Sequence, residues 1–271
     1  MNHFIIPLLI CTNFLWADFL WEGQNYHRNS QSQQTAALEL LNQFSLRGDE
    51  AILDAGCGDG KITKDLAERV PQGSVIGIDL SASQIAFAKS METENLSFEV
   101  ADIQELPFDQ QFDLVTCLTS IQWVPDQAQA FKSLYRTLKP QGKLLLTLPT
   151  GMTWQLSEAV REVISRDEWK AFSFRDKQFF FTREVYAATI RKAGFKIESF
   201  KILPSSNLFT DRATFTAFVK QWLPFVQDVP PDLRDEFMRQ VIDVYLELLP
   251  SSAQGEVFFD KYVYQLTLSR P

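Results

Sequence analysis

The 271-residue chain is long enough for one large α/β domain, or for a core domain with a modest insertion. Its net charge of −8 argues against a general nucleic-acid-binding protein, which needs a basic face to displace counterions. Three cysteines without CxxC spacing and only two histidines indicate neither a disulfide framework nor a zinc site, so no metal is expected.

An apolar run over residues 4–16 opens the chain. It is shorter than the roughly 20 residues that span a bilayer, so stable membrane insertion is not expected. Its length suits the core of a signal peptide, and residues 15–17 match a cleavage site, but residues 1–4 lack the basic leader. We expect a cytoplasmic protein whose residues 1–17 form a helix or lid on the domain; cleavage and export are the alternative.

The most informative segment is a glycine turn that carries acids, D-A-G-C-G-D-G at residues 54–60. It follows a strand pattern at residues 51–53 and precedes a helical pattern through residue 70. A strand, a tight glycine turn and a helix bring backbone N–H groups against a ligand. Asp54 and Asp59 would repel phosphates and attract a cation. The turn therefore favours a cationic nucleoside without phosphates, namely S-adenosylmethionine (SAM).

Further strand patterns alternate with helical patterns along the first 150 residues. The strands are expected at 74–80, 96–101, 112–118 and 143–148, and the helices at 84–91 and 128–138. This alternation predicts an α/β fold with a doubly wound parallel sheet that is covered on both faces. Ligands of such sheets bind outside the carboxyl ends of the strands.

The rhythm changes after Pro149. Helical patterns at 156–164, 183–193, 215–222 and 233–248 surround strand patterns at 196–203 and 257–268. We expect residues 151–182 and 204–252 to be helical insertions that cap the ligand edge of the sheet. The segment 169–181 is rich in aromatic residues and forms either the core of the cap or the wall of an apolar substrate pocket. Its aromatic residues are Trp169, Phe172, Phe174, Phe179, Phe180 and Phe181.

Two more acids end consecutive strand patterns. Asp79 ends the second strand and can accept hydrogen bonds from both ribose hydroxyls of a nucleoside. Asp102 ends the third strand and can accept one from an adenine amino group. The glycines are spaced G-x-G-x-G, with Lys61 where a dinucleotide turn has its third glycine, which disfavours a dehydrogenase. A phosphate-binding P-loop is excluded as well, because no Gly-Lys-Ser/Thr follows.

Together these residues resemble the class I, seven-stranded SAM-dependent methyltransferases. The resemblance rests on D-A-G-C-G-D-G, G-I-D-L-S, A-D-I, and F-D-L-V with I-Q-W-V-P-D, and it covers a methyltransferase domain from residue 18 to residue 271. It implies a Rossmann-like sheet of order 3-2-1-4-5-7-6 whose last strand is antiparallel.

The same resemblance assigns the cofactor contacts. It implies that the methionine portion of SAM is lined by Gly56, Cys57, Gly58 and Gly60, the ribose by Asp79 and the adenine by Asp102. It adds Asp54, Leu80, Ile103 and Cys117 to the cofactor-binding set. Cys57 is expected to be a small residue of the turn and not a nucleophile.

Residues 120–126 narrow the resemblance, because S-I-Q-W-V-P-D is similar to trans-aconitate methyltransferases and to the methyltransferase of biotin synthesis. Insect juvenile-hormone-acid methyltransferases carry a related segment. The W…Y…S…Q pattern of Trp21, Tyr26, Ser30 and Gln33 matches as well. These relatives esterify carboxylic acids. By analogy with plant carboxyl methyltransferases, Gln33 and Trp123 position the acceptor carboxylate, although Trp123 could also serve only in packing.

The expected reaction is an in-line displacement on a small-molecule acid or on an acid bound to an acyl carrier protein. A carboxylate of pKa about 4 is already ionised at neutral pH, so no general base is needed. The alternatives are a carbon or nitrogen acceptor and a SAM-binding protein without activity. Methylation of nucleic-acid amino groups is disfavoured, because residues 118–120 lack the Asn/Asp-Pro-Pro-aromatic signature.

Overall fold

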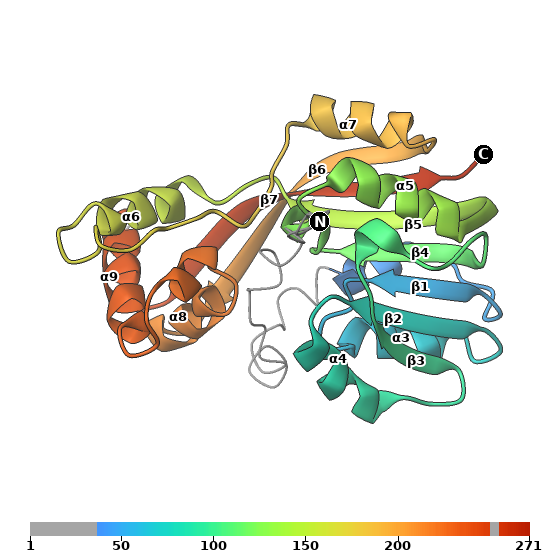
Figure 1. The fold of residues 1–271 in the computed structure, drawn as a ribbon, viewed down its shortest axis with the longest axis horizontal. Helices are drawn as coiled ribbons and strands as arrows, with labels where there is room; N and C mark the ends of the chain where they lie inside the picture. The colour runs from blue at the N-terminus through green and yellow to red at the C-terminus, as the bar shows by residue number, and fades with distance from the viewer. Residues whose placement is uncertain (1–36, 250–254) are drawn as a thin grey trace, which may run out of the picture.

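The structure, a computed structural model, describes residues 37–249 and 255–271. Within these ranges seven strands form one sheet in the order β3-β2-β1-β4-β5-β7-β6 (Figure 1). Strands β1 to β5 are parallel, and β7 runs antiparallel to both of its neighbours, β5 and β6. The predicted order and the antiparallel last strand are therefore confirmed. The strands are β1 Ala51–Ala55, β2 Ser74–Asp79, β3 Leu96–Val100, β4 Phe112–Leu118, β5 Leu138–Pro149, β6 Lys196–Phe209 and β7 Val257–Ser269.

Five of the described α-helices begin where a short polar side chain caps the first turn. Asp126, Thr153 and Thr182, for example, each accept a hydrogen bond from the backbone N–H three residues further on, which a helix cannot satisfy internally. The α-helices are α3 Lys61–Arg69, α4 Ala82–Ala88, α5 Gln127–Thr137, α6 Trp154–Ile164, α7 Arg183–Lys192, α8 Arg212–Lys220 and α9 Arg234–Glu247. Short 3₁₀ turns are η1 Lys89–Met91, η2 Ile103–Glu105, η3 Ile121–Trp123 and η4 Pro224–Asp228.

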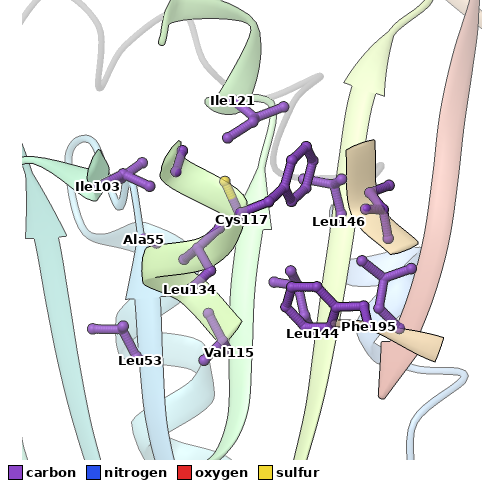
Figure 2. Packing of buried hydrophobic residues seen from close by; sticks show 14 of the residues in the cluster. Leu53, Ala55, Ile103, Val115, Cys117, Ile121, Leu134, Leu144, Leu146 and Phe195 are labelled. Carbon is purple, nitrogen blue, oxygen red and sulfur yellow. The ribbon is translucent and has the colours of Figure 1, made fainter. Parts of the chain in front are cut away.

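The sheet is buried on both faces, which explains the continuous apolar runs of its strands. Neighbouring residues of one strand enter different cores: Leu53 packs with α5 and α7, whereas Ile52 packs with α3 and α4. Figure 2 shows the first of these cores, in which Val115 and Leu144 of the sheet lie beside Leu134 of α5. This two-sided packing fixes the carboxyl ends of β1 to β5 along one edge.

A separate apolar core lies beyond that edge. Helices α6, α8 and α9 pack with the extended ends of β6 and β7, away from the helices that cover the sheet (Figure 1). The sequence pattern predicts a strand that ends at Leu203, but β6 continues to Phe209 and pairs with residues 257–262 of β7. Pro204 is tolerated there because β6 is an edge strand, where a missing N–H costs no ladder bond.

The aromatic segment 169–181 was expected to form either the core of the cap or the wall of a pocket, and its residues divide between the two. Trp169, Phe172 and Phe174 pack in the helical core, with Trp169 and Phe174 placing their ring centroids 5.2 and 5.4 Å from that of Phe237. Phe180 instead lines a cavity. The segment therefore contributes to both the helical core and a cavity wall.

Asp113 at the start of β4 provides a test of the sheet's polar edge. Its Oδ2 accepts hydrogen bonds from Ala51 N at 2.9 Å and from Lys139 Nζ at 2.7 Å. Partial burial works to raise the pKa of Asp113, but the bonds from Lys139 and Ala51 outweigh it and hold the pKa below its usual value. We expect Asp113→Asn to lower the free energy of unfolding by about 1–2 kcal/mol at pH 7.

The stabilisation by Asp113 should decrease at acidic pH. Because the pKa is lower in the folded state, the stabilisation is present above the unfolded pKa and is lost as the pH falls through the folded value. Urea unfolding should therefore separate the two proteins at pH 7, and the difference should shrink progressively as the pH falls below about 4. The exposed Asp109→Asn is the matched control. A difference of the same size at both pH values would contradict this account of Asp113.

Candidate functional site

The glycine turn joins β1 to α3 through three residues with left-handed backbones. Gly56, Gly58 and Gly60 have φ values of 79°, 54° and 81°, a conformation that side chains with a Cβ rarely adopt. The turn is tied to β2, because Gly56 N and Cys57 N both donate to Ile78 O, at 2.8 and 2.9 Å. These contacts hold the turn over the carboxyl ends of β1 and β2.

The segment after β4 closes on the turn from the other side. Ser120 Oγ donates to Gly56 O at 2.9 Å, and a Cβ placed on Gly56 would lie 2.4 Å from both Cβ and Oγ of Ser120. Only glycine leaves room for this approach. The turn is therefore fixed between β2 and the start of the motif at residues 120–126.

Two carboxylates fix the turn through hydrogen bonds: Asp54 bonds to α3 and β4, and Asp79, at the end of β2, bonds to the turn itself. The buried Asp54 accepts hydrogen bonds from Thr116 Oγ1 at 2.6 Å and from Thr63 Oγ1 at 2.7 Å. Asp79 accepts from Gly58 N through Oδ2 at 3.0 Å and from Ser81 N through Oδ1 at 2.8 Å. A carboxylate offers about four acceptor positions, so Asp79 retains two for the hydroxyls of a ligand.

The three acids around the turn make it electrostatically negative. Burial raises the pKa of Asp54; the bonds from Thr116 and Thr63 oppose that rise, and the negative charges of Asp79 and Asp59 add to it. Burial also raises the pKa of Asp79, against the hydrogen bonds from the N–H groups of Ser81 and Gly58. A ligand cation beside the turn would relieve this mutual repulsion, so the residues present fit the sulfonium of SAM.

The ends of β2 and β3 add apolar and polar groups along the same edge. Leu80 is 53% exposed directly after Asp79, which leaves an apolar surface for a planar ring. Asp102 caps η2 and accepts from Gln104 N at 2.8 Å, and the buried Ile103 places its Cδ1 3.7 Å from a Cβ built on Gly56. The structure thus brings the predicted residues of β2, η2 and the turn together.

Both described cysteines of the predicted set are buried. Burial, and then the charges of Asp79 and Asp54, raise the pKa of Cys57 well above its ordinary value, so its thiol stays protonated at neutral pH. Burial also raises the pKa of Cys117. Figure 2 shows the Cys117 sulfur within the core, in the same cluster as Ile121 and Ile103, so its side chain lies beneath the edge.

An open cavity of about 560 Å³, including the space that opens to solvent, lies at the carboxyl ends of β4 and β5. Trp123 is part of its wall, where a residue that positions an acceptor is expected. Gln33, the other predicted positioning residue, lies outside the described residues, as do Trp21, Tyr26, Ser30 and the apolar run 4–16. The lining residues are Thr119, Gln122, Trp123, Pro149, Gly151, Met152, Thr153, Gln178, Phe180, Phe218, Trp222, Phe259 and Lys261.

The β4 side of the cavity is held in a strained conformation. Thr119 has φ 58°, which is unfavourable for a β-branched residue. Its N–H donates to Thr147 O at 2.7 Å, and its carbonyl accepts from Gln122 Nε2 at 2.9 Å. Gln122 O in turn accepts from Phe179 N at 2.7 Å, so the aromatic segment is anchored to the motif that carries Trp123.

Much of the remaining wall was not anticipated from the sequence motifs. Phe218 and Trp222 come from α8 and the residues after it, and Lys261 comes from β7. Lys261 shares its strand face with Val257 and Phe259, both buried, because alternate residues of a strand point the same way. A charge in this apolar alternation is the sequence signal that could have identified it.

Two further observations concern the described residues only. They contain no group of three or more His, Cys, Asp or Glu side chains that could hold a metal ion. None of the helices within 37–249 and 255–271 combines the length and the apolar character that crossing a membrane requires.

The sequence of this chain is similar to those of known methyltransferases. The family described as methyltransferase domain matches residues 46–202, which include the glycine turn, Asp79, Asp102 and Trp123. A candidate methyltransferase, 235L, of Invertebrate iridescent virus 6 is 27% identical over 85% of this chain and 87% of its own. The malonyl-[acyl-carrier protein] O-methyltransferase of Priestia megaterium is 29% identical over 82% and 85%.

The chain is also similar to a further relative and to a solved structure. The trans-aconitate 2-methyltransferase of Shigella flexneri is 28% identical over 88% of this chain and 93% of its own. The crystal structure of a candidate methyltransferase from Bacillus halodurans superimposes with a TM-score of 0.63, at 17% identity, over 88% of this chain and 99% of that one. At that identity the likeness concerns the fold.

Proposed function

Because the chain belongs to the methyltransferase domain family, it is a SAM-dependent methyltransferase, and we propose that its acceptor is a carboxylate of a small-molecule or carrier-bound acid. The observation that carries the proposal is the short link between turn and cavity. Ser120 Oγ bonds to the glycine turn, while Gln122 and Trp123, two and three residues later, line the cavity. A donor at the turn and an acceptor in the cavity would therefore be neighbours.

When bound, SAM supplies an electrophilic methyl group on a sulfonium. In our proposal Asp79 accepts the ribose hydroxyls, Leu80 and Ile103 pack against the adenine, and Asp102 accepts its amino group. The backbone of the glycine turn lies along the methionine portion. Asp54 and Cys117, which are buried behind the turn, act by fixing its shape. The proposed cofactor-binding set, including these two supporting residues, comprises Asp54, Gly56, Cys57, Gly58, Gly60, Asp79, Leu80, Asp102, Ile103 and Cys117.

The chain's main contribution is to orient the acceptor. Trp123, together with Gln33, would hold the carboxylate near 3 Å from the methyl carbon, the separation at which positioning supplies most of the rate enhancement. The acceptor is already an anion at neutral pH, so no residue needs to remove a proton. The names of the relatives, which refer to trans-aconitate and to malonyl-[acyl-carrier protein], support an acid. The insertions at 151–182 and 204–252, which carry helices α6, α8 and α9 and the end of β6, would exclude water from the cavity.

The test is to incubate the purified protein with methyl-labelled SAM and a panel of free and carrier-bound acids. A base-labile methyl ester is the expected product. A base-stable product would instead support a carbon or nitrogen acceptor. Binding of S-adenosylhomocysteine (SAH) without methylation of any acceptor would support a protein that holds SAM without turnover.

Trp123→Ala is expected to raise the KM for the acid by about 10- to 100-fold while the affinity for SAH stays unchanged. The reason is that Trp123 lies in the cavity wall, outside the glycine turn. The matched control is Trp154→Ala, because Trp154 is 65% exposed on α6 and does not line the cavity. Steady-state kinetics with a responsive acid, and calorimetry with SAH, provide the two readouts. Equal effects of both substitutions would rule out acceptor positioning by Trp123.

We also propose that the protein acts in the cytoplasm, because SAM is a cytosolic metabolite. The N-terminal residue of the mature protein tests this: an intact Met1 agrees with it. A new terminus near residue 18 would establish cleavage and export instead.

A further inference from the structure

Lys261 is a cation in the cavity wall for which the described residues supply no counter-ion. It is partly buried on β7, and its Nζ lies 5.8 Å from the ring centroid of Phe259. Among the described residues no carboxylate forms an ion pair with it, and the cavity lining contains neither Asp nor Glu. Removal from water lowers the pKa of Lys261 to about 8. An anion beside the ammonium would offset that loss of hydration.

A second donor and two acceptors in the same wall also lack partners within the part of the chain that the structure describes. The buried Nε1 of Trp222 finds no hydrogen-bond acceptor among the described residues. The Oε1 atoms of Gln122 and Gln178 likewise have no donor there. Buried polar groups are normally satisfied, so unsatisfied ones in a cavity indicate a polar ligand. Lys261 and Trp222 together are suited to bind an anion.

The sheet order places Lys261 away from the glycine turn. Val263, two residues beyond it on β7, pairs with Pro149 of β5, and β5 separates β7 from β4. Adjacent strands lie about 4.8 Å apart, so Lys261 is about 10 Å from the line of β4 and about 14 Å from that of β1. The acceptor group that meets the methyl donor lies near β1 and β4. A group bound to Lys261 is therefore a different part of the acceptor.

We propose that Lys261 determines acceptor specificity by binding a second carboxylate, so that the preferred acceptor is a dicarboxylic acid. This inference rests on the proposed function. One carboxylate, near Trp123, forms the new O–CH₃ bond as the S–CH₃ bond of the sulfonium breaks, so that this carboxylate becomes a neutral ester group and the sulfonium becomes a neutral thioether. No proton moves. The other carboxylate pairs with the Lys261 ammonium, accepts from Trp222 Nε1, and keeps its charge in the product.

Separate roles for the two carboxylates also follow from electrostatics. An ammonium bonded to the reacting oxygen would withdraw the electron density that attacks the methyl group. Placed on the second carboxylate, the same charge contributes to binding in the ground state and in the transition state alike. Loss of Lys261 should then change KM and leave kcat near its original value.

The experiment is calorimetry on the full chain saturated with SAH, using straight-chain dicarboxylates and monocarboxylates of matched lengths. We expect the best dicarboxylate to bind about 30-fold more tightly than its monocarboxylate partner. Lys261→Met should abolish that preference. The matched control is Lys201→Met, because Lys201 is exposed on β6 outside the cavity and should leave the preference intact. Unchanged SAH affinity and thermal midpoint would show that the variants fold.

A preference that survives in Lys261→Met, or no preference in the original protein, overturns the inference. The ester assay separates this from the proposed function. Lys261-dependent binding of dicarboxylates without ester formation would contradict the proposed function and support the subsite. Ester formation with an unchanged KM in Lys261→Met would support the proposed function and contradict the subsite.

A measurement on the unaltered protein covers the case in which Lys261→Met does not fold. Reductive ¹³C-methylation of the lysines makes each side chain visible to NMR. The Lys261 resonance, identified by its loss in Lys261→Arg, should titrate at a higher pH when the dicarboxylate is added. No movement at saturating dicarboxylate would contradict the ion pair.

Discussion

Asp79→Ala is expected to weaken the binding of SAH by about 100-fold or more, as measured by calorimetry. The substitution removes the only carboxylate at the end of β2 whose remaining acceptor positions can take both ribose hydroxyls. It also leaves Gly58 N and Ser81 N without their acceptors, so the turn loses its tie to the β2 end. Each charge-assisted hydrogen bond contributes about 1.5–3 kcal/mol, and two lost bonds account for the expected change.

The matched control is Glu99→Ala, which removes an exposed carboxylate from the neighbouring strand β3. Its effect on SAH affinity should stay within about twofold, since surface substitutions away from a site change little. Thermal unfolding of both variants distinguishes loss of the ribose contact from loss of the fold. An Asp79→Ala protein that keeps SAH affinity within a few-fold of the original would remove Asp79 from the cofactor site.

Gly56→Ala should lower the free energy of unfolding by about 3 kcal/mol and abolish SAH binding. Two costs add at this position. The backbone is left-handed, with φ 79°, and the new Cβ would lie 2.4 Å from Ser120 Cβ and Oγ. To relieve the contact the turn must move away from the segment that carries Gln122 and Trp123. Urea unfolding and calorimetry with SAH provide the two measurements.

Gly255→Ala separates the two costs. Gly255 has a similar φ of 74°, but a Cβ there meets none of the described residues within 4 Å, so only the backbone cost of about 1 kcal/mol should appear. Combining Gly56→Ala with Ser120→Gly should recover part of the stability, because the clashing atoms are gone. If Gly56→Ala cost no more than Gly255→Ala, the close approach of Ser120 to the turn would be wrong.

The fold was readable from the sequence where its signals are local. Strand β4 was predicted with its observed bounds, because a strand buried on both faces is a continuous apolar run. Strand β5 was predicted from residue 143, yet it begins at Leu138, since the Lys139–Gly142 segment has the composition of a turn. There Phe112 pairs with Leu138 across an irregular register. That pairing depends on β4, which a local pattern does not contain.

In the candidate site, too, the residues of local motifs are predictable from the sequence and those from distant segments are not. Gly56, Gly58 and Asp79 form a motif within 24 residues, and in the structure Gly58 N donates to Asp79 while Gly56 N donates to the carbonyl of the residue before it, Ile78. Trp123 was placed from its motif and lies in the cavity wall. Lys261 joins that wall only because β7 inserts between β5 and β6, which is a consequence of the sheet order. Its role depends on what surrounds it, and its neighbours come from distant segments.

One titration tests most directly the claim that the acidic turn selects a cationic nucleoside without phosphates. The same preparation of the full chain is titrated with SAH and, separately, with NADH. The account predicts saturable heat with SAH and none with NADH, because Asp54, Asp59 and Asp79 repel a diphosphate. Saturable binding of NADH, with no heat from SAH, would contradict it.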